Sequence, residues 1–421
     1  MKQHREETVH LDKLVHGGQA LSRLPDGRAV FVWGGLPGEM VAIMLTKQKK
    51  DYCEAVVRQV LEPSKERIEP RDAAYLSTSP WQIMSSEAED NYKKAILEET
   101  FQRSDAHGLQ KISFSPAKTF WQYRNKMEYS FFGDETGLHL ALYQRGTRCK
   151  QILTGSSIAM PSIDKTAEAI RQLLEKNNVR ASDLKAVIVR SNQVGDTAAA
   201  LFVKREDFPD IKQLSGTCQG VVVYYSTSKS PASVATKQLY RYGDSVLQDE
   251  ISRHPINYDV TSFFQVNVPE LEPVIERMSS HLSGSDEVID FYAGVGTFAR
   301  VLNATKMVEL DEANIKLARR NVSKACAIIH ASAENSLEHI PSGSTTVLIV
   351  DPPRAGLHKK VIQQILAQRP ARITYLSCNP VTQARDIALL QGLYGLVELS
   401  GHNFFPRTPH IESLALLELK A

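Results

Sequence analysis

Three short stretches near the C-terminus carry side chains that could do covalent chemistry. Cys378 stands in "YLSCNP", between a β-rich run and an Asn-Pro turn, where Ser or Gly would turn the chain as well. A thiolate adds readily to an electron-poor carbon and can leave again afterwards. His410 and Glu412 lie in "FPRTPHIE", and Asp351 closes the apolar run "TTVLIVD" before two prolines. A carboxylate or an imidazole could accept the proton that such a reaction releases.

These residues stand at the ends of predicted strands in an α/β region that begins near residue 286. The apolar strands expected there are "DEVIDFYA", "MVEL", "AIIHAS", "TTVLIVD" and "RITYLSC", and helical segments alternate with them. This alternation is typical of a parallel, doubly wound sheet. In such sheets ligands bind outside the carboxyl ends of the strands. We therefore expect the reactive residues to share one pocket with a ligand.

A glycine-rich turn after the first of these strands indicates a nucleoside cofactor. "DFYAGVGTFA" places Gly294 and Gly296 between a strand and a helix, where the backbone can approach a ligand closely. NAD and S-adenosylmethionine both fit the glycines. Asp290 could meet a cationic group, and Glu309 closes the next strand about fifteen residues after Gly294, where it could hold two ribose hydroxyls. The dinucleotide fingerprint has a gap of about 20 residues, so S-adenosylmethionine is favoured.

The acceptor chemistry follows from Cys378 and from the residue after the proline pair. Amino-group methyltransferases place an aromatic residue there to stack the base, whereas this chain has Arg354. A lone strand-end cysteine is often only a small buried hydrophobe. Beside a methyl donor it gains a role, because carbon 5 of uracil is a poor methyl acceptor until a nucleophile adds to carbon 6. Glu412 is the candidate base that removes the carbon-5 proton; His410 competes for that role, and a plain strand-edge Glu is the alternative.

Composition and cysteine usage narrow the class of protein. The 421 residues are enough for two or three domains, and the 42% hydrophobic and 23% charged content is ordinary for a globular protein. A net charge of +2 means that any nucleic-acid surface is a local patch. Five scattered cysteines without a C-x-x-C pair predict reduced thiols in the cytoplasm and no zinc site. Neither a membrane-length apolar run nor a secretory signal is found, and we expect a monomer.

The pattern of strand-like and helix-like segments along the chain predicts three regions. Residues 1–62 read as a small OB-type β-barrel, 63–256 as an α+β domain, and 257–421 as the α/β domain. A helix around 87–104 could pack on the third region. The basic stretches "KQKK" and "PSKERIEPR" give the barrel either a phosphate-facing edge or solvated loops. In "YRNKMEYSF", Arg124 and Lys126 share one strand face beside aromatic residues, which suits single-stranded RNA, although a solvated edge strand fits equally.

Taken together, the sequence resembles the S-adenosylmethionine-dependent RNA uracil-5-methyltransferases, which act on ribosomal and transfer RNA. The motifs that carry the resemblance are "FFQVN", "DFYAGVGTF", "VDPPRAGL", "YLSCNP" and "FPRTPHIE". The resemblance covers nearly the whole chain and implies a TRAM-like barrel, a central domain and a Rossmann-like class I methyltransferase domain. It implies that Cys378 is the nucleophile and Glu412 the base. The positions that match cofactor contacts in the family are Gln265, Tyr292, Thr297, Glu309 and Asp351.

The sequence departs from the family pattern in two places. Many members hold an iron–sulfur cluster on four cysteines, but "PRDAAYLSTSPWQIM" and "TGSSIAMP" contain none, and Ser79 stands where the last cysteine of the first run belongs. Cys149 is nearby but cannot ligate a cluster alone. We therefore predict that this chain has no iron–sulfur cluster. Asn403 stands where the family usually has Asp before its "FP" pair.

The resulting functional prediction is methyl transfer from S-adenosylmethionine to carbon 5 of a uridine in RNA, through a covalent adduct of Cys378 with carbon 6. The uridine would be extruded from its stack into the pocket. We expect 23S ribosomal RNA as the target, with transfer RNA as the alternative. A non-catalytic RNA-binding protein that kept the fold would be expected to lose Cys378 or Glu412, and both are present. A nicotinamide oxidoreductase is the other rival.

Overall fold

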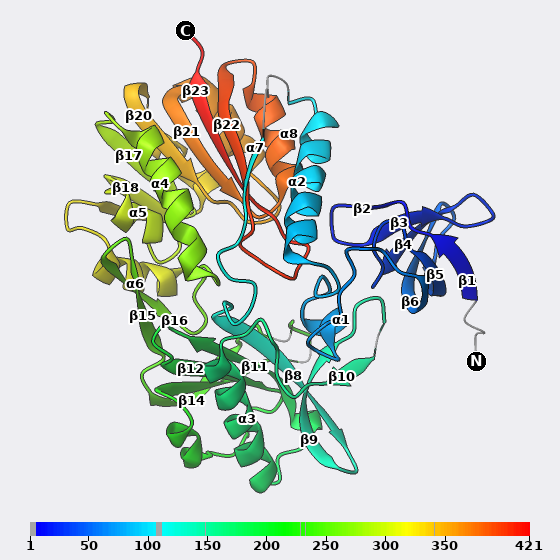
Figure 1. Cartoon of the computed structure of the whole chain (residues 1–421). Coiled ribbons are helices and arrows are strands. Elements are labelled where there is room, and N and C mark those ends of the chain that lie inside the picture. Colours follow the sequence, from blue (N-terminus) through cyan, green and yellow to red (C-terminus); the bar gives the residue numbers. More distant parts are fainter. Residues whose placement is uncertain (1–5, 107–111, 148, 228, 232, 341) are drawn as a thin grey trace.

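The structure is a computed structural model that describes residues 6–106, 112–147, 149–227, 229–231, 233–340 and 342–421. Figure 1 shows three bodies: an N-terminal sheet in blue, a central sheet in green and a C-terminal sheet in yellow to red. Helix α2 (Ser86–Gln102) lies between the first and the third of these bodies. No helix in the described ranges is long and apolar enough to cross a membrane.

The N-terminal body is a six-stranded sheet in the order β1-β5-β6-β4-β3-β2. Its strands are β1 Glu6–His10, β2 Lys13–Leu14, β3 Ala20–Arg23, β4 Ala29–Trp33, β5 Met40–Gln48 and β6 Tyr52–Glu62. Buried and half-exposed residues alternate along β4 and most of β5, as expected for strands with one face on a core. The turn in "PDG" joins β3 to β4 as its composition predicts, with Gly27 at φ 88°.

The central body is a seven-stranded sheet in the order β10-β9-β8-β11-β12-β13-β14, with α3 and the short α1 against it. Its elements are α1 Tyr75–Thr78, β8 Lys126–Asp134, β9 Gly137–Tyr143, β10 Lys150–Ile152, α3 Pro161–Lys176, β11 Leu184–Ser191, β12 Thr197–Val203, β13 Gly220–Tyr225 and β14 Lys237–Gly243. The buried face of α3, which includes Ile163, Ala167, Ile170 and Leu174, packs into the core of this sheet. A hairpin of β15 (Val246–Ile251) and β16 (His254–Asp259) leads to the C-terminal body.

The C-terminal body is an eight-stranded sheet in the order β19-β18-β17-β20-β21-β23-β22-β7. Its strands are β7 Ser113–Ser115, β17 Glu287–Phe291, β18 Lys306–Glu309, β19 Ala327–His330, β20 Gly343–Val350, β21 Pro370–Ser377, β22 Tyr394–His402 and β23 Glu412–Leu419. Its helices are α4 Leu271–Leu282, α5 Thr297–Val301, α6 Glu312–Asn321, α7 Lys359–Gln368 and α8 Pro380–Leu390. Strands β17 to β21 are parallel, and both faces of their apolar runs are buried under helices.

Two features of this sheet differ from a purely parallel arrangement. Strand β23 inserts antiparallel between β21 and β22, so its first residue lies at the edge where the parallel strands end. Strand β7, from the predicted central region, pairs with β22 at the far side of the sheet. The predicted division at residues 62 and 256 stays a prediction, and the chain after α2 contributes β7 to the C-terminal body.

Helix α2 contributes to two cores at once. Ala88 and Ile96 belong to the core of the N-terminal sheet, whereas Leu97 and Phe101 belong to the core beneath the C-terminal sheet. The helix also packs on α8 and β22. The expected packing of the 87–104 segment on the third region is therefore present in the structure, and the same helix attaches the N-terminal body to it.

Candidate functional site

One cavity lies at the carboxyl edge of the C-terminal sheet, as the strand order predicts. Strands β17, β18, β20 and β21 end there and place Gly294, Glu309, Asp351 and Cys378 at its wall. The cavity has a volume of about 490 Å³. Its other lining residues are Arg124, Phe263, Phe264, Gln265, Val266, Tyr292, Asn314, Pro352, Pro353, Arg354, Phe405, His410 and Glu412. The structure therefore brings the reactive residues and most of the predicted cofactor positions into one space.

Cys378 and Glu412 meet because β21 and β23 are antiparallel neighbours. The register pairs Ser377 with Ser413, so the residue after β21 and the first residue of β23 lie beside each other. The Glu412 side chain is 1% exposed, and its Oε1 has no hydrogen-bond partner among the described residues. A buried carboxylate oxygen without a partner is costly unless a ligand or a reacting group uses it.

The charged groups around Cys378 shift its pKa in opposite directions. Burial, followed by the carboxyl groups of Glu412 and Asp351, raises the pKa of Cys378 to about 11, while the guanidinium of Arg354 opposes this shift. Burial and Asp351 also raise the pKa of Glu412 well above its ordinary value, again against Arg354. The pocket thus favours neutral acids, and Arg354 acts on both the thiol and the carboxyl group.

The cofactor side of the cavity is built by hydrogen bonds to the glycine turn. Glu309 accepts hydrogen bonds from the backbone N–H groups of Gly294 and Asp311, both at 2.7 Å. Gln265 donates to Asp351 Oδ2 at 3.5 Å. Tyr292 has φ 63°, a left-handed conformation that is uncommon for a residue with a side chain and that concentrates at functional sites.

Four residues with predicted ligand contacts do not line this cavity. Gly296 is at φ 82°, and a Cβ there would lie 2.7 Å from Val322 Cγ1, so its role in this structure is close packing against the following helix. Thr297 is buried, and Lys126 begins β8 away from the cavity wall. Asp290 is fully buried and accepts a hydrogen bond from the backbone N–H of Ala299 at 3.0 Å.

The prediction that Arg124 and Lys126 share one strand face is wrong, because β8 starts at Lys126 and Arg124 precedes it. Arg124 forms an isolated bridge with Ala159 and donates its Nε hydrogen to the backbone oxygen of Lys126 at 2.9 Å. It lines the cavity whereas Lys126 does not. The basic character of the stretch therefore reaches the site through one of the two residues.

Several lining residues were not assigned a role from the sequence. Arg354 lies 3.2 Å from His410 Nδ1, measured from its NH2 nitrogen. The Phe263 side chain lines the cavity and is 63% exposed, and the Phe405 ring lies 5.7 Å from the His410 ring. The signals were present in "FFQVN", "DPPR" and "FFPRTPH". They could not be read as cavity residues because each comes from a loop whose position depends on distant packing.

The stretch that lacks the family's cluster cysteines is joined by hydrogen bonds around Asp72. This carboxylate accepts hydrogen bonds from the Ser157 N–H (3.1 Å) and hydroxyl, from Thr78 (3.2 Å) and from Gln82 (2.8 Å). Gln82 also donates to Ser79 at 2.5 Å. Within the described ranges no group of three or more His, Cys, Asp or Glu residues is placed to hold a metal ion. The absence of an iron–sulfur cluster stays a prediction.

Comparison with known proteins agrees with the geometry. A family model for tRNA (uracil-5-)-methyltransferases matches residues 86–420. A Thermotoga maritima protein described as an uncharacterized RNA methyltransferase is 27% identical over 440 residues, covering 98% of each chain. A similarly described protein of Nitratidesulfovibrio vulgaris is 28% identical over 453 residues, covering 98% of this chain and 96% of its own.

A solved structure has the same fold. It is the Pyrococcus abyssi tRNA (uracil-54, C5)-methyltransferase in complex with S-adenosyl-L-homocysteine, with a TM-score of 0.78 at 20% identity, and the match covers 98% of this chain and 100% of that one. This likeness confirms the predicted fold class, a Rossmann-like methyltransferase domain with an N-terminal barrel-like sheet and a central α+β part. The family match over residues 86–420 shows that the chain belongs to the tRNA (uracil-5-)-methyltransferase family.

Proposed function

We propose that this protein transfers a methyl group from S-adenosylmethionine to carbon 5 of a uridine in RNA, with Cys378 as the nucleophile and Glu412 as the base. The observation that carries the proposal is the pairing of these two residues across β21 and β23, inside the cavity that Glu309 and Asp351 also line. A catalytically idle relative would have no need to keep a thiol and a carboxyl group with an unpartnered oxygen in one buried space.

The cavity suits the predicted methyl donor. Glu309 ends β18 and Asp351 follows β20, the two strands on either side of β17. Carboxylates bind hydroxyl and cationic groups. Gly294 adds no side chain to the space, and Phe263 offers an exposed ring at the rim. Gln265 and Tyr292 complete this wall. When bound, S-adenosylmethionine supplies an electrophilic methyl group.

The chain's own residues account for the other steps. Extrusion of the uridine costs a few kcal/mol, which stacking and phosphate contacts offset. The Cys378 thiolate adds to carbon 6, the new S–C6 bond pushes electron density to carbon 5, and carbon 5 becomes able to accept the methyl group. Glu412 then takes the carbon-5 proton, the C5–C6 double bond re-forms, and the thiolate leaves.

Electrostatics favour Glu412 over His410 as the base. Burial, followed by the arginines around it, lowers the pKa of His410 to about 3, so its imidazole is a weak proton acceptor in this site. The pKa of Glu412 is shifted in the opposite direction by burial and by Asp351, which makes its carboxylate a stronger base than an exposed one. Because the resting pocket favours the neutral acid, Glu412 must be in its carboxylate form when it removes the carbon-5 proton.

The function is tested with RNA from cells that lack the gene. The purified protein and isotope-labelled S-adenosylmethionine are added to total RNA separated into ribosomal and transfer fractions, and nucleosides are analysed by mass spectrometry. We expect 5-methyluridine in 23S ribosomal RNA; labelled transfer RNA would assign the alternative target, and no 5-methyluridine in either fraction would refute the proposal. Titration calorimetry with S-adenosylmethionine and with NAD distinguishes the proposed methyltransferase from a nicotinamide oxidoreductase, which would bind NAD.

The raised pKa of Cys378 leads to a prediction for the free protein. The thiolate is the reactive form, and a thiol pKa of about 11 leaves the group protonated at neutral pH. We expect the rate of Cys378 alkylation by iodoacetamide to rise about tenfold per pH unit through the neutral and mildly alkaline range. Peptide mass spectrometry measures the rate, with exposed Cys149 as the internal reference. A rate that levels off near neutral pH would show that the resting thiol is already ionised.

Two arginines line the cavity and a third, Arg145, lies near them; we propose that all three bind RNA phosphates. Arg124 and Arg354 line the cavity, and Arg145 contacts the Trp33 ring with its guanidinium 5.1 Å from the ring centroid. Burial, then Arg354 and Arg124, lower the pKa of Arg145, so the three charges lie close enough to repel one another. Among the described residues none of the three forms an ion pair with a carboxylate, and Arg145 Nε has no hydrogen-bond partner. Phosphates would relieve this repulsion.

We expect Arg145→Ala to weaken RNA binding at every salt concentration and to flatten its salt dependence. Losing one phosphate contact reduces the slope of log K against log salt by about 0.7 for a single strand. Fluorescence anisotropy over a KCl series measures the slope, and affinity for S-adenosylmethionine should stay unchanged. Arg205→Ala is the matched control, because that exposed arginine pairs with Asp207. An unchanged slope for Arg145→Ala would remove this residue from the RNA surface.

A further inference from the structure

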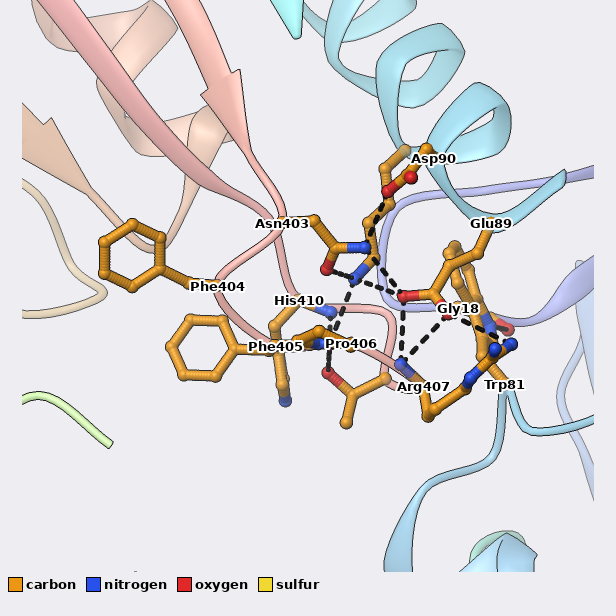
Figure 2. A network of polar contacts seen from close by, with 12 residues as sticks. Gly18, Trp81, Glu89, Asp90, Asn403, Phe404, Phe405, Pro406, Arg407 and His410 are labelled. Carbon is orange, nitrogen blue, oxygen red and sulfur yellow. Dashed lines mark hydrogen bonds and ion pairs between the residues drawn. The ribbon is translucent and has the colours of Figure 1, made fainter. Parts of the chain in front are cut away.

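The loop of residues 403–410 joins β22 to β23 and contributes two residues, Phe405 and His410, to the cavity wall. After Ile411, Glu412 begins β23. Figure 2 shows the rings of Phe404 and Phe405 on one side of this loop and Glu89 with its polar neighbours on the other. The network on that second side lies outside the cavity, so the mechanism described above does not use it.

Lys93 of α2 is the centre of this network and is fully buried. Its ammonium group donates to Glu89 (2.9 Å), to Asn403 Oδ1 (2.6 Å) and to the backbone oxygen of Phe405 (3.0 Å). Three acceptors use all three ammonium hydrogens, so the contacts require the charged form although burial lowers the pKa of Lys93. A fully buried lysine is rare unless it is paired, and here two of its three bonds hold the loop.

Glu89 holds the same loop from one helical turn earlier. It is fully buried and accepts the backbone N–H of Arg407 at 2.9 Å and the Asn403 amide at 3.1 Å. Arg407 has φ 63°, so its backbone is in a conformation that the surroundings must maintain. The Asn403 amide also donates to Asp90 at 2.7 Å. An aspartate at 403 could not donate to these carboxylates, so this network requires the amide.

The loop is also anchored by segments from the other two bodies. The Tyr123 hydroxyl donates to the backbone oxygen of Pro406 at 2.8 Å, and the backbone N–H of Trp81 donates to the backbone oxygen of Arg407 at 3.0 Å. The Arg407 guanidinium packs over the Phe120 ring at 4.7 Å. These contacts fix the middle of the loop at Pro406 and Arg407, whereas Lys93 holds the backbone of Phe405, the residue that reaches the cavity.

We propose that the buried Glu89–Lys93 pair is a positioning device for the reaction: it holds the 403–410 loop so that Phe405, His410 and Glu412 stay in place around the reacting base. Lys93 and Glu89 touch neither Cys378 nor the cavity, so they act through the loop. For its kinetic consequence the inference rests on the proposed function, in which Glu412 removes the proton that releases the adduct.

The test variant is the double substitution Glu89→Gln with Lys93→Met. Removing Lys93 alone would leave the buried Glu89 carboxylate with only the more distant Arg407 guanidinium, at 3.6 Å, as a cationic partner and could unfold the protein. In the double variant the new amide side chain at position 89 can still accept the Arg407 N–H and can donate to Asn403, while the bond to the Phe405 oxygen is lost. Lys94→Met is the surface control, since its ion pair with Glu98 is 3.9 Å long and exposed. Leu174→Ala, in the central core, is the destabilised control.

Two readouts separate positioning from simple loss of stability. Hydrogen exchange by mass spectrometry should show at least tenfold faster exchange in peptides spanning residues 403–411 of the double variant, and not in either control. With the RNA fraction that the wild type methylates, kcat should fall at least tenfold while KM for S-adenosylmethionine changes less than threefold. Unchanged exchange, or a kcat that falls only with the unfolded fraction as in Leu174→Ala, would overturn the inference. A wild type without methylation would refute the proposed function alone, because hydrogen exchange still decides the positioning.

Discussion

Cys378→Ala is expected to abolish methylation while RNA still binds. Without the thiol nothing in the cavity can add to carbon 6, so carbon 5 stays too electron-poor to accept the methyl group. Removal of an enzyme's covalent nucleophile lowers turnover by on the order of 10⁴-fold or more. The phosphate contacts proposed for Arg124, Arg145 and Arg354 are untouched, and the dissociation constant for RNA should change less than threefold. Single-turnover methylation assays and anisotropy measure the two quantities.

The appropriate control for this variant is Cys149→Ala, which changes an exposed cysteine that does not line the cavity. It should methylate RNA at the wild-type rate. Normal methylation by Cys378→Ala would show that the reaction proceeds without covalent catalysis. A loss of RNA binding in parallel with activity would instead indicate that the substitution had disturbed the loop after β21.

The strand-end residues of the site were predictable because parallel strands have a simple sequence signature. The run before Asp351 and the run before Cys378 are continuous and apolar, since helices cover both faces of the sheet, and their carboxyl ends must share an edge. Glu309 followed from the same rule. The direction of β23 did not, because an apolar run reads the same in a parallel or an antiparallel strand. From the residues Glu412 was one candidate base beside His410, and its assignment over His410 came from the family resemblance.

Residues on loops and between bodies were beyond the reach of sequence patterns. Helical periodicity predicted α2 and its apolar positions, but a lysine in such a helix is normally solvated, so the burial of Lys93 had no sequence signal. Arg145 reaches Trp33 only because the central body docks against the N-terminal sheet. Gly294 lines the cavity whereas Gly296 packs against the following helix in this structure, and spacing alone cannot separate the two uses.

Glu412→Gln is expected to trap the covalent protein–RNA intermediate rather than prevent its formation. The glutamine side chain is nearly isosteric and cannot accept the carbon-5 proton, so Cys378 adds and methyl transfer occurs, but elimination stalls. Loss of a general base slows its step by roughly 10²–10⁴-fold. The adduct should appear as a slowly migrating band of labelled RNA in denaturing electrophoresis, and should require S-adenosylmethionine, since addition to carbon 6 alone is reversible.

Two matched variants decide whether that band has the proposed origin. Adding Cys378→Ala to Glu412→Gln should remove it, because the band depends on the sulfur–carbon bond. His410→Asn should not accumulate it, since the imidazole, with a pKa of about 3, is not the group that takes the proton. If His410→Asn traps the adduct and Glu412→Gln turns over normally, the roles of the two residues must be exchanged. If neither variant accumulates an adduct while both are slow, the variants affect a step before methyl transfer. The Glu412 carboxyl group would then act on the addition of the Cys378 thiolate to carbon 6.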